Sequence, residues 1–187
     1  MMAGGATTRR PRAGRAAAAL IVAGCVAGLP VALPVLLGAA PRELQLPWLA
    51  AFGGAFALRL DALAAAFMVP LCLVCALAAV YGLAYLGDAS DTQDRRRQRA
   101  AWGSTLLLAA GVALVLLARN ALLFLAAWEI TALSSFMLVA HEDEKPEARR
   151  AGTVYLAATH VGTLFLLVFF MVAAKRSGSL DFDDWRT

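Results

Sequence analysis

The chain has 187 residues, of which 61% are hydrophobic and 16% are charged, and its formal net charge is +4. Soluble domains carry about 25% charged residues, whereas a mean hydropathy of +0.70 is typical of a membrane protein. These figures exclude an ordinary cytosolic enzyme, a disordered protein and a small secreted domain held together by disulfides.

Five apolar stretches separate short connections that hold almost all of the charge. The only acidic or basic side chains inside the stretches are Glu129 and His160. Each stretch approaches the roughly 20 residues that a helix needs to cross the hydrocarbon core, and a helix satisfies its own backbone in lipid. We therefore predict an all-α integral membrane protein with five transmembrane helices, at residues 16–40, 62–86, 102–118, 121–140 and 151–174.

The distribution of Lys and Arg predicts the orientation of these helices. Eleven of them fall on one side of the membrane and six on the other. The positive-inside rule then assigns residues 1–15 to a basic cytoplasmic N-terminus. A five-helix membrane domain follows at 16–174, and residues 175–187 form an external tail that we expect to be truncated. The arginine run at 95–97 fits a topology signal in a short loop, so we expect no nucleic-acid partner.

The first stretch could also be a targeting signal. Arg9 and Arg10 suggest a twin-arginine signal, and residues 22–25 resemble a lipoprotein cleavage site. The apolar run continues well past Cys25, which makes it longer than the core of a signal peptide. We predict a retained first helix and keep processing as the alternative.

The three cysteines, Cys25, Cys72 and Cys75, lie inside predicted spans. A thiol in such a place behaves as a small hydrophobic group. Cys72 and Cys75 share a helix face, but no His or second Cys pair stands near them in the sequence to complete a metal site. We interpret all three as packing residues, and we expect neither a metal nor another cofactor.

The longest external connection, residues 41–61, is apolar on both sides of a Gly-Gly pair at 53–54. This pattern suggests a hairpin-like loop that lies on the membrane face. Asp61 stands directly before the second apolar stretch, where a carboxylate can cap the helix and interact favourably with its dipole. We therefore predict a structural role for Asp61.

Glu129 lies close to the centre of the fourth stretch, at the depth of the bilayer midplane. A charge at that depth costs at least about 2.5–3.5 kcal/mol, and such residues commonly mark proton or ion routes. The alternative is a permanently protonated Glu129 that only fastens neighbouring helices. No Lys or Arg lies in any of the five stretches, so desolvation favours the neutral acid.

His160 occupies a similar depth in the fifth stretch, which a ten-residue connection at 141–150 makes the antiparallel neighbour of the fourth. Thr153 and Thr163 share its helix face. Imidazole exchanges protons near neutral pH, so this polar stripe could serve proton transfer. The alternative is a neutral His160 satisfied by a threonine or a carbonyl. Glu129 and His160 are our candidate proton-transfer residues.

Three segments, at residues 58–68, 128–139 and 155–163, resemble the antiporter-like membrane subunits of the complex I/Mrp superfamily. Within this family, the large membrane subunit of hydrogenase-4 and formate hydrogenlyase is the most similar branch. The resemblance covers about residues 42–187 and is most specific at Trp128-Glu129 and at residues 158–162. By this resemblance Glu129 matches an intramembrane glutamate that takes part in proton translocation. His160 matches a histidine of the hydrogenase-type branch.

The resemblance implies membership of a membrane-bound hydrogenase or an NADH-quinone oxidoreductase-like complex in the bacterial inner membrane. Its partners would be the lipid bilayer and other membrane and peripheral subunits, which carry the redox chemistry, so this chain alone would catalyse nothing. Family members are much longer and pair the glutamate with a lysine on a later helix. The chain thus resembles a fragment, a truncated gene product or half of a split protein. A membrane anchor or assembly module and a component of a Na⁺/H⁺ multisubunit antiporter remain alternatives.

Overall fold

The computed structural model describes residues 12–49, 51, 54–85, 92–140 and 146–186 of the chain. Residues 1–11 of the predicted N-terminal segment lie outside this part. The elements are, in order, α1 (Arg12–Leu36), β1 (Arg42–Pro47), β2 (Ala55–Leu60), α2 (Ala62–Tyr85), α3 (Thr92–Leu117), α4 (Ala121–Val139), α5 (Pro146–Ser177) and the 3-10 helix η3 (Phe182–Arg186). Among the described helices, five are long and apolar enough to cross a membrane, which confirms the predicted class.

Three helices begin earlier than the hydropathy pattern predicts, and α1 starts at Arg12 rather than at residue 16. α3 starts at Thr92 rather than at residue 102. Arginine is a good helix former, so the arginines before the apolar stretch are part of the same helix. α5 starts at Pro146, a residue that favours the first helical position, and runs for 32 residues. At 1.5 Å per residue α5 is about 48 Å long, so it extends beyond the roughly 30 Å of hydrocarbon.

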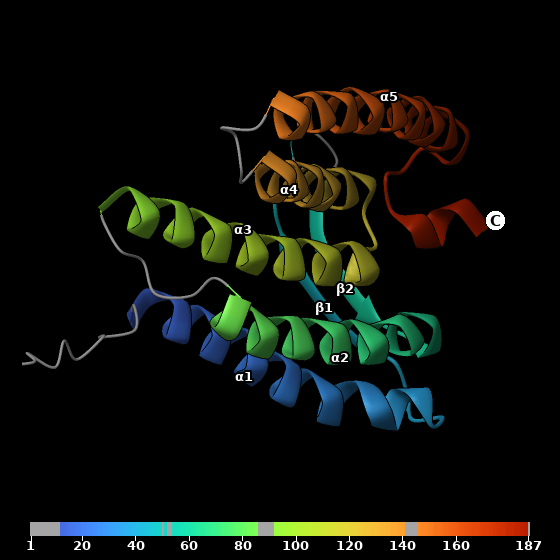
Figure 1. Cartoon of the computed structure of the whole chain (residues 1–187). Coiled ribbons are helices and arrows are strands. Elements are labelled where there is room, and N and C mark those ends of the chain that lie inside the picture. Colours follow the sequence, from blue (N-terminus) through green and yellow to red (C-terminus); the bar gives the residue numbers. More distant parts are fainter. Residues whose placement is uncertain (1–11, 50, 52–53, 86–91, 141–145, 187) are drawn as a thin grey trace, which may run out of the picture.

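The helices form two antiparallel pairs with α5 added at one side (Figure 1). α1 packs along α2, α3 packs along α4, and α5 lies against α4. Small apolar side chains fill the contact between α1 and α2, and this cluster includes Ala17, Ala18, Ala32, Ala64, Ala65 and Ala79. Such small residues let helix backbones approach closely in a membrane, where packing rather than water exclusion holds helices together.

The indole of Trp102 joins α3 to the α1–α2 pair. Trp102 is only 4% exposed. A Cβ added at Gly14 of α1 would lie 2.7 Å from its Nε1, and one at Gly82 of α2 would lie 3.0 Å from its ring. The indole therefore occupies space that exists only because both facing residues are glycines.

Glycine also sets the distance between α3 and α4, and between α4 and α5. A Cβ at Gly111 of α3 would lie 2.6 Å from Oγ1 of Thr131 on α4. A Cβ at Gly152 of α5 would lie 3.1 Å from the ring of Phe136 on α4. Close packing on two sides of α4 thus depends on two residues without side chains.

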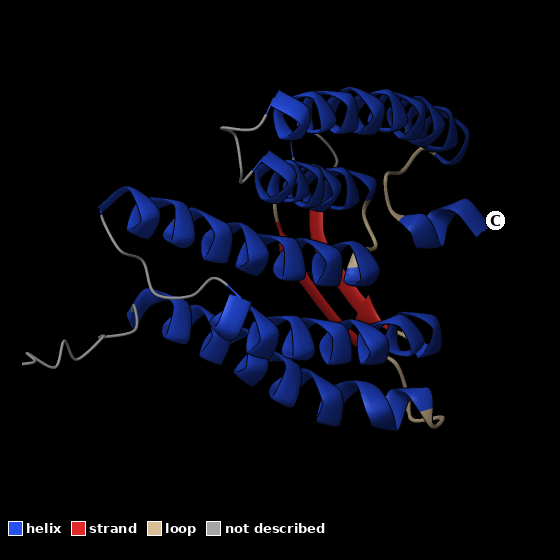
Figure 2. Cartoon of the chain, in the orientation of Figure 1, coloured by secondary structure: helices blue, strands red, loops and turns tan. Residues whose placement is uncertain are grey.

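The predicted hairpin is present between α1 and α2. β1 and β2 pair in antiparallel register from Arg42↔Leu60 to Pro47↔Ala55, and in Figure 2 the two strands cross one side of the helices. The backbone N–H of Arg119, just after α3, donates to the carbonyl of Ala57 at 2.9 Å. The hairpin is therefore attached to the turn between α3 and α4.

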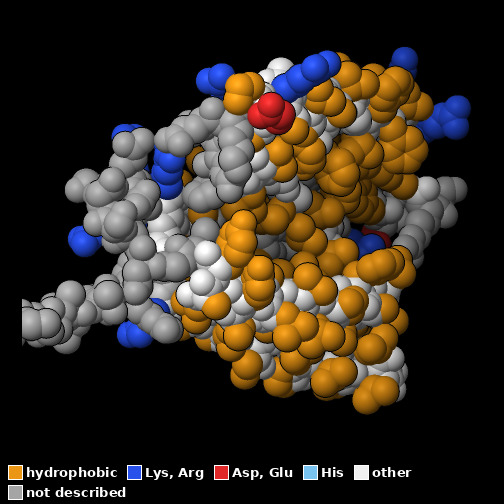
Figure 3. Space-filling view, in the orientation of Figure 1, with side chains coloured by type: hydrophobic (Ala, Val, Ile, Leu, Met, Phe, Trp, Pro, Cys, Tyr) orange, Lys and Arg blue, Asp and Glu red, His pale blue; other side chains and the backbone are white. Residues whose placement is uncertain are grey.

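The helix surfaces are mainly apolar. In Figure 3 hydrophobic side chains cover most of the face in view, and Lys and Arg lie mainly along its edges. Among the described residues α5 carries many exposed large apolar side chains, including Leu164, Phe165, Val168 and Met171. This distribution suits helices whose flanks face hydrocarbon or other membrane proteins.

We predict that Gly111→Ala destabilises the chain by about 1–3 kcal/mol, the usual penalty for overpacking. The added methyl would collide with Thr131. Thermal unfolding in detergent, followed by reaction of the cysteines with a fluorogenic maleimide, measures the change in Tm. Gly103→Ala is the matched control on the same helix, because nothing lies within 4 Å of its added Cβ. It should leave Tm unchanged or raise it; equal effects of both variants would contradict the prediction.

Candidate functional site

Helix α4 places Glu129 near its own midpoint. The helix has 19 residues and begins after Asn120, whose side chain accepts a hydrogen bond from the N–H of Leu122 at 3.1 Å. At 1.5 Å per residue α4 is about 28 Å long, which matches the thickness of the hydrocarbon core. Glu129, near the centre of Ala121–Val139, thus lies far from both ends of the helix.

The carboxylate of Glu129 has two oxygens in different surroundings. Oε1 is buried and has no hydrogen-bond partner among the described residues. Oε2 lies 3.8 Å from Nε2 of His160 on α5. This distance is too long for a direct hydrogen bond but short enough for an ion pair or for a small approach that brings the two atoms into contact.

The orientation of His160 is set by its own helix. Its Nδ1 lies 2.9 Å from the carbonyl oxygen of Leu156. Since a carbonyl can only accept, this contact assigns a proton to Nδ1 and leaves Nε2 facing Glu129. In the neutral ring Nε2 is a proton acceptor, and in the charged ring it is a donor. The pair can therefore hold a shared proton on either residue.

The side chain of Glu129 is 33% exposed and that of His160 is 51% exposed. A pair at mid-helix depth with this exposure is open on one side to whatever surrounds α4 and α5. Bare hydrocarbon on that side would leave polar atoms unsatisfied. Polar groups or water on that side would satisfy these atoms.

Hydroxyl groups of α4 and α5 form hydrogen bonds within their own helices. Thr131 and Ser134 of α4 donate to the carbonyls four residues before them, at 2.9 and 2.6 Å. On α5, Thr153 and Thr163 do the same, at 2.9 and 3.1 Å. This pattern satisfies a hydroxyl in an apolar medium. The site is therefore centred on the Glu129–His160 pair rather than on the hydroxyl stripe.

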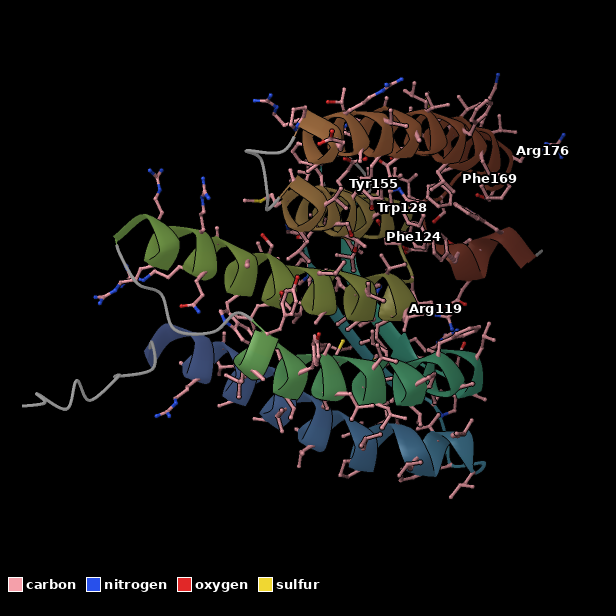
Figure 4. All side chains as sticks on the ribbon, viewed as in Figure 1. Arg119, Phe124, Trp128, Tyr155, Phe169 and Arg176 are labelled. Atoms are coloured by element: carbon pink, nitrogen blue, oxygen red, sulfur yellow. The ribbon has the colours of Figure 1, made fainter. Side chains whose placement is uncertain are left out.

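An aromatic cluster adjoins the site. Trp128, beside Glu129 in the chain, stacks on Phe124 with ring centroids 6.1 Å apart. Phe124 in turn contacts Phe170 of α5 at 5.4 Å and Phe182 of η3 at 6.1 Å. Figure 4 shows Phe124, Trp128 and Phe169 at the boundary of α4 and α5. These rings hold α4 and α5 together beside the Glu129–His160 pair.

A second polar group, which we call the outer clasp, comprises Asp61, Arg119, Asn120 and Asp181. Arg119 forms a salt bridge with Asp61, and Asn120 donates from Nδ2 to Asp181 Oδ1 at 2.7 Å. The sequence analysis assigned Asp61 only as a helix cap. That role is confirmed by its bond to the N–H of Ala64 at 2.8 Å. The sequence carried one sign of the other contacts in the outer clasp: Arg119 and Asn120 are the only residues between the third and fourth predicted spans.

Backbone hydrogen bonds complete the outer clasp. The N–H of Ala121 donates to the carbonyl of Leu180 at 2.9 Å, and the N–H of Phe182 donates to that of Arg119 at 2.8 Å. Beside it, Arg59 of β2 pairs with Glu43 at 2.6 Å and with Asp183 at 2.7 Å. The hairpin, the start of α4 and the segment after α5 are thus tied together at the same end of the bundle.

The described residues contain no group of three or more His, Cys, Asp or Glu placed to hold a metal ion. Cys25, Cys72 and Cys75 are free thiols within the helices, as their interpretation as packing residues requires.

Comparisons with known proteins agree with this architecture. A family model described as NADH:quinone oxidoreductase/Mrp antiporter, TM, matches residues 118–187. Hydrogenase-4 component B of Escherichia coli is 30% identical over 130 residues, which are 70% of this chain and 19% of that protein. A probable K(+)/H(+) antiporter subunit of Rhizobium meliloti is 26% identical over 150 residues, covering 80% of this chain and 14% of that one.

A solved structure supports the same assignment. The Mrp complex from a Dietzia species contains a chain that matches with a TM-score of 0.72 and 25% identity, covering 90% of this chain and 17% of that one. The molecule is thus a multi-pass membrane protein of the antiporter-like type. The family model, the hydrogenase-4 relative and the Mrp structure together support an antiporter-like membrane subunit of the complex I/Mrp superfamily. The chain spans about a fifth of the length of hydrogenase-4 component B.

The outer clasp should make the stability of the chain depend on acid pH. Burial alone would raise the pKa of Asp61, but the bond from Ala64 and the charge of Arg119 outweigh it and lower the pKa below its ordinary value of 3.8. Ionised Asp61 then stabilises the folded chain at neutral pH, and this contribution is lost as the pH falls through about 4 and towards the lower folded-state pKa.

The Tm of the wild type should therefore exceed that of Asp61→Asn at pH 7, and the difference should shrink as the pH falls below about 4. Glu147→Gln, a change at an exposed acid in the first turn of α5, is the control and should show little such dependence. A difference between the wild type and Asp61→Asn that stays constant over this range would contradict the role of the carboxylate.

Proposed function

We propose that the chain forms part of a proton-translocating membrane subunit, in which Glu129 takes part in proton transfer and His160 is its neighbouring proton acceptor and donor. The complex would be a membrane-bound hydrogenase or an NADH-quinone oxidoreductase-like assembly in the bacterial inner membrane. The likeness to hydrogenase-4 component B favours the hydrogenase branch. The distribution of Lys and Arg supports a cytoplasmic N-terminus.

The observation that carries this proposal is the surroundings of the Glu129 carboxylate. Its Oε1 is buried without a hydrogen-bond partner among the described residues, and Oε2 faces Nε2 of His160 at 3.8 Å. A carboxyl group that served only to fasten helices would be expected to have its polar atoms bonded. A carboxyl group that exchanges protons needs a nearby partner whose protonation can change, and imidazole is such a partner.

The two residues could exchange a proton by a small approach or through one water molecule. Protonated Glu129 with neutral His160, and ionised Glu129 with protonated His160, have the same total charge. The proton can therefore move between them without bringing another charge into the membrane. Because the five apolar stretches contain no Lys or Arg, a permanent positive charge that stabilises ionised Glu129 would come from a further membrane segment or another protein of the complex.

We predict that Glu129→Gln, introduced into the complete complex, lowers proton pumping by at least about tenfold while electron transfer remains measurable. Glutamine keeps the size of the side chain but cannot release a proton. Pumping is measured with a pH-sensitive dye in membrane vesicles, together with the redox rate. Glu147→Gln is the matched control, since it makes the same change at an exposed acid near the beginning of α5. Unchanged pumping in Glu129→Gln would refute the proposal.

Two alternatives predict other outcomes. In a membrane anchor or assembly module, Glu129→Gln would leave coupling intact and Glu129→Leu would reduce the amount of assembled complex. In a Na⁺/H⁺ multisubunit antiporter, the same site would act without redox partners, and Na⁺-driven rather than electron-driven pH changes would depend on Glu129. The likeness to the probable K(+)/H(+) antiporter subunit of Rhizobium meliloti favours a multisubunit cation/H⁺ antiporter in general and does not distinguish Na⁺ from K⁺.

The 187-residue chain by itself should move no protons, because its five apolar stretches contain no permanently charged Lys or Arg that would stabilise ionised Glu129 after His160 has released its proton. Proteoliposomes that hold only this polypeptide and an internal pH dye provide the measurement. The imposed pH gradient should decay as in protein-free liposomes. A faster decay that disappears in Glu129→Gln would show that the chain is sufficient for transport.

A further inference from the structure

An apolar cavity lies between α1, α2 and α3, away from Glu129. Its volume is about 260 Å³. We call it the three-helix cavity, and its lining includes Leu20, Gly24, Cys25, Cys72, Leu106 and Ala110. Because Leu20 is 63% exposed, the cavity reaches the surface beside α1.

Water and protein helices are poor occupants of this space. A buried water molecule needs two to four polar partners, and an apolar cavity that lacks them stays dry. A helix is at least about 10 Å across, so 260 Å³ would hold only a few ångströms of its length. A slender aliphatic chain satisfies both limits on polarity and width.

The positive charge at one end of the bundle indicates what kind of molecule carries this aliphatic chain. α1 and α3 both begin at that end (Figure 1), and Arg15, Arg95, Arg96 and Arg99 there are exposed. Arg15 precedes Leu20 by about 8 Å of helix, and Arg99 precedes Leu106 by about 10 Å. A lipid with its headgroup beside these arginines would have its acyl chain at the depth of the three-helix cavity.

We propose that the three-helix cavity binds one acyl chain of an anionic membrane phospholipid, whose headgroup lies against the arginines at the beginning of α1 and α3. The Trp102 indole fills the space between the three helices at Gly14 and Gly82, so the acyl chain enters from the side, next to the exposed Leu20. The bound lipid fills space that the helices leave open and thereby supports the contact between the α1–α2 pair and α3.

Gly24 provides a direct way to block the cavity. It lines the cavity, and nothing lies within 4 Å of a Cβ added there. Gly24→Leu should therefore begin its side chain in open space and occupy part of the cavity. Gly162→Leu on α5 is the matched control, because its added Cβ also meets nothing within 4 Å and Gly162 is not among the cavity residues. Ala110→Leu, on the opposite wall, is a second blocking variant.

The test reconstitutes the whole chain in vesicles that contain phosphatidylglycerol or phosphatidylcholine with a photoactivatable diazirine in the acyl chain. Peptide mass spectrometry then locates the crosslinks. With phosphatidylglycerol we expect crosslinks concentrated on cavity residues of α1, α2 and α3, about fivefold more than with phosphatidylcholine, the factor that one arginine contributes near an anionic headgroup. Gly24→Leu and Ala110→Leu should reduce them to the level of the lipid-facing residues of α5, and Gly162→Leu should not.

The thermal stability of each variant in detergent shows whether it is folded, and either folded blocking variant is sufficient for the test. Crosslinks spread evenly over all apolar helix surfaces would overturn the proposal. Cavity crosslinks that persist in a folded blocking variant, or that are equal for the two headgroups, would overturn it as well.

Discussion

The turn between α3 and α4 is the constraint on which the arrangement of this bundle depends. Ala118 forms an isolated β-bridge with Leu58, and only Arg119 and Asn120 separate it from the first residue of α4. Asn120 is fully buried, and buried polar groups are stable only when they are bonded. Asn120 donates to Asp181, which follows α5, and the neighbouring Arg119 pairs with Asp61, which precedes α2. The segments before α2 and after α5 are thus brought together by their hydrogen bonds and salt bridge to one short turn.

This turn also determines where the candidate site lies. Since α4 begins at Ala121 and rises 1.5 Å per residue, a fixed start fixes the depth of Glu129. The segment after α5 binds the same turn, and the aromatic cluster holds α5 against α4. The distance between Glu129 and His160 is therefore set by bonds near one end of the helices and not by a direct bond between the two residues.

Glycine and alanine allow close contacts between the helices of the membrane domain. They also leave space between some helices unfilled. Gly111 and Gly152 bring α3 and α5 near to α4, where a methyl group would already be too large or tightly packed. The same small residues leave the three-helix cavity open at Gly24. Glycine and alanine fill little space between helices. The openings that they leave can therefore accept lipid chains or other membrane proteins.

The membrane class, the five spans, the hairpin and the cap at Asp61 could all be predicted from the sequence, because hydropathy over about 20 residues and local capping are short-range properties. Glu129 and His160 also stood out, since polar residues in an apolar run are unusual in any conformation. The starts of α1, α3 and α5 lie before the predicted ones, because a helix can begin in polar sequence outside the apolar stretch that crosses the membrane. The folded chain was needed to show that Nε2 of His160 faces Glu129, that Arg119 meets Asp61 and that Trp102 packs on two glycines. These contacts join residues far apart in the chain, and their geometry depends on helix rotation and packing, which no local pattern encodes.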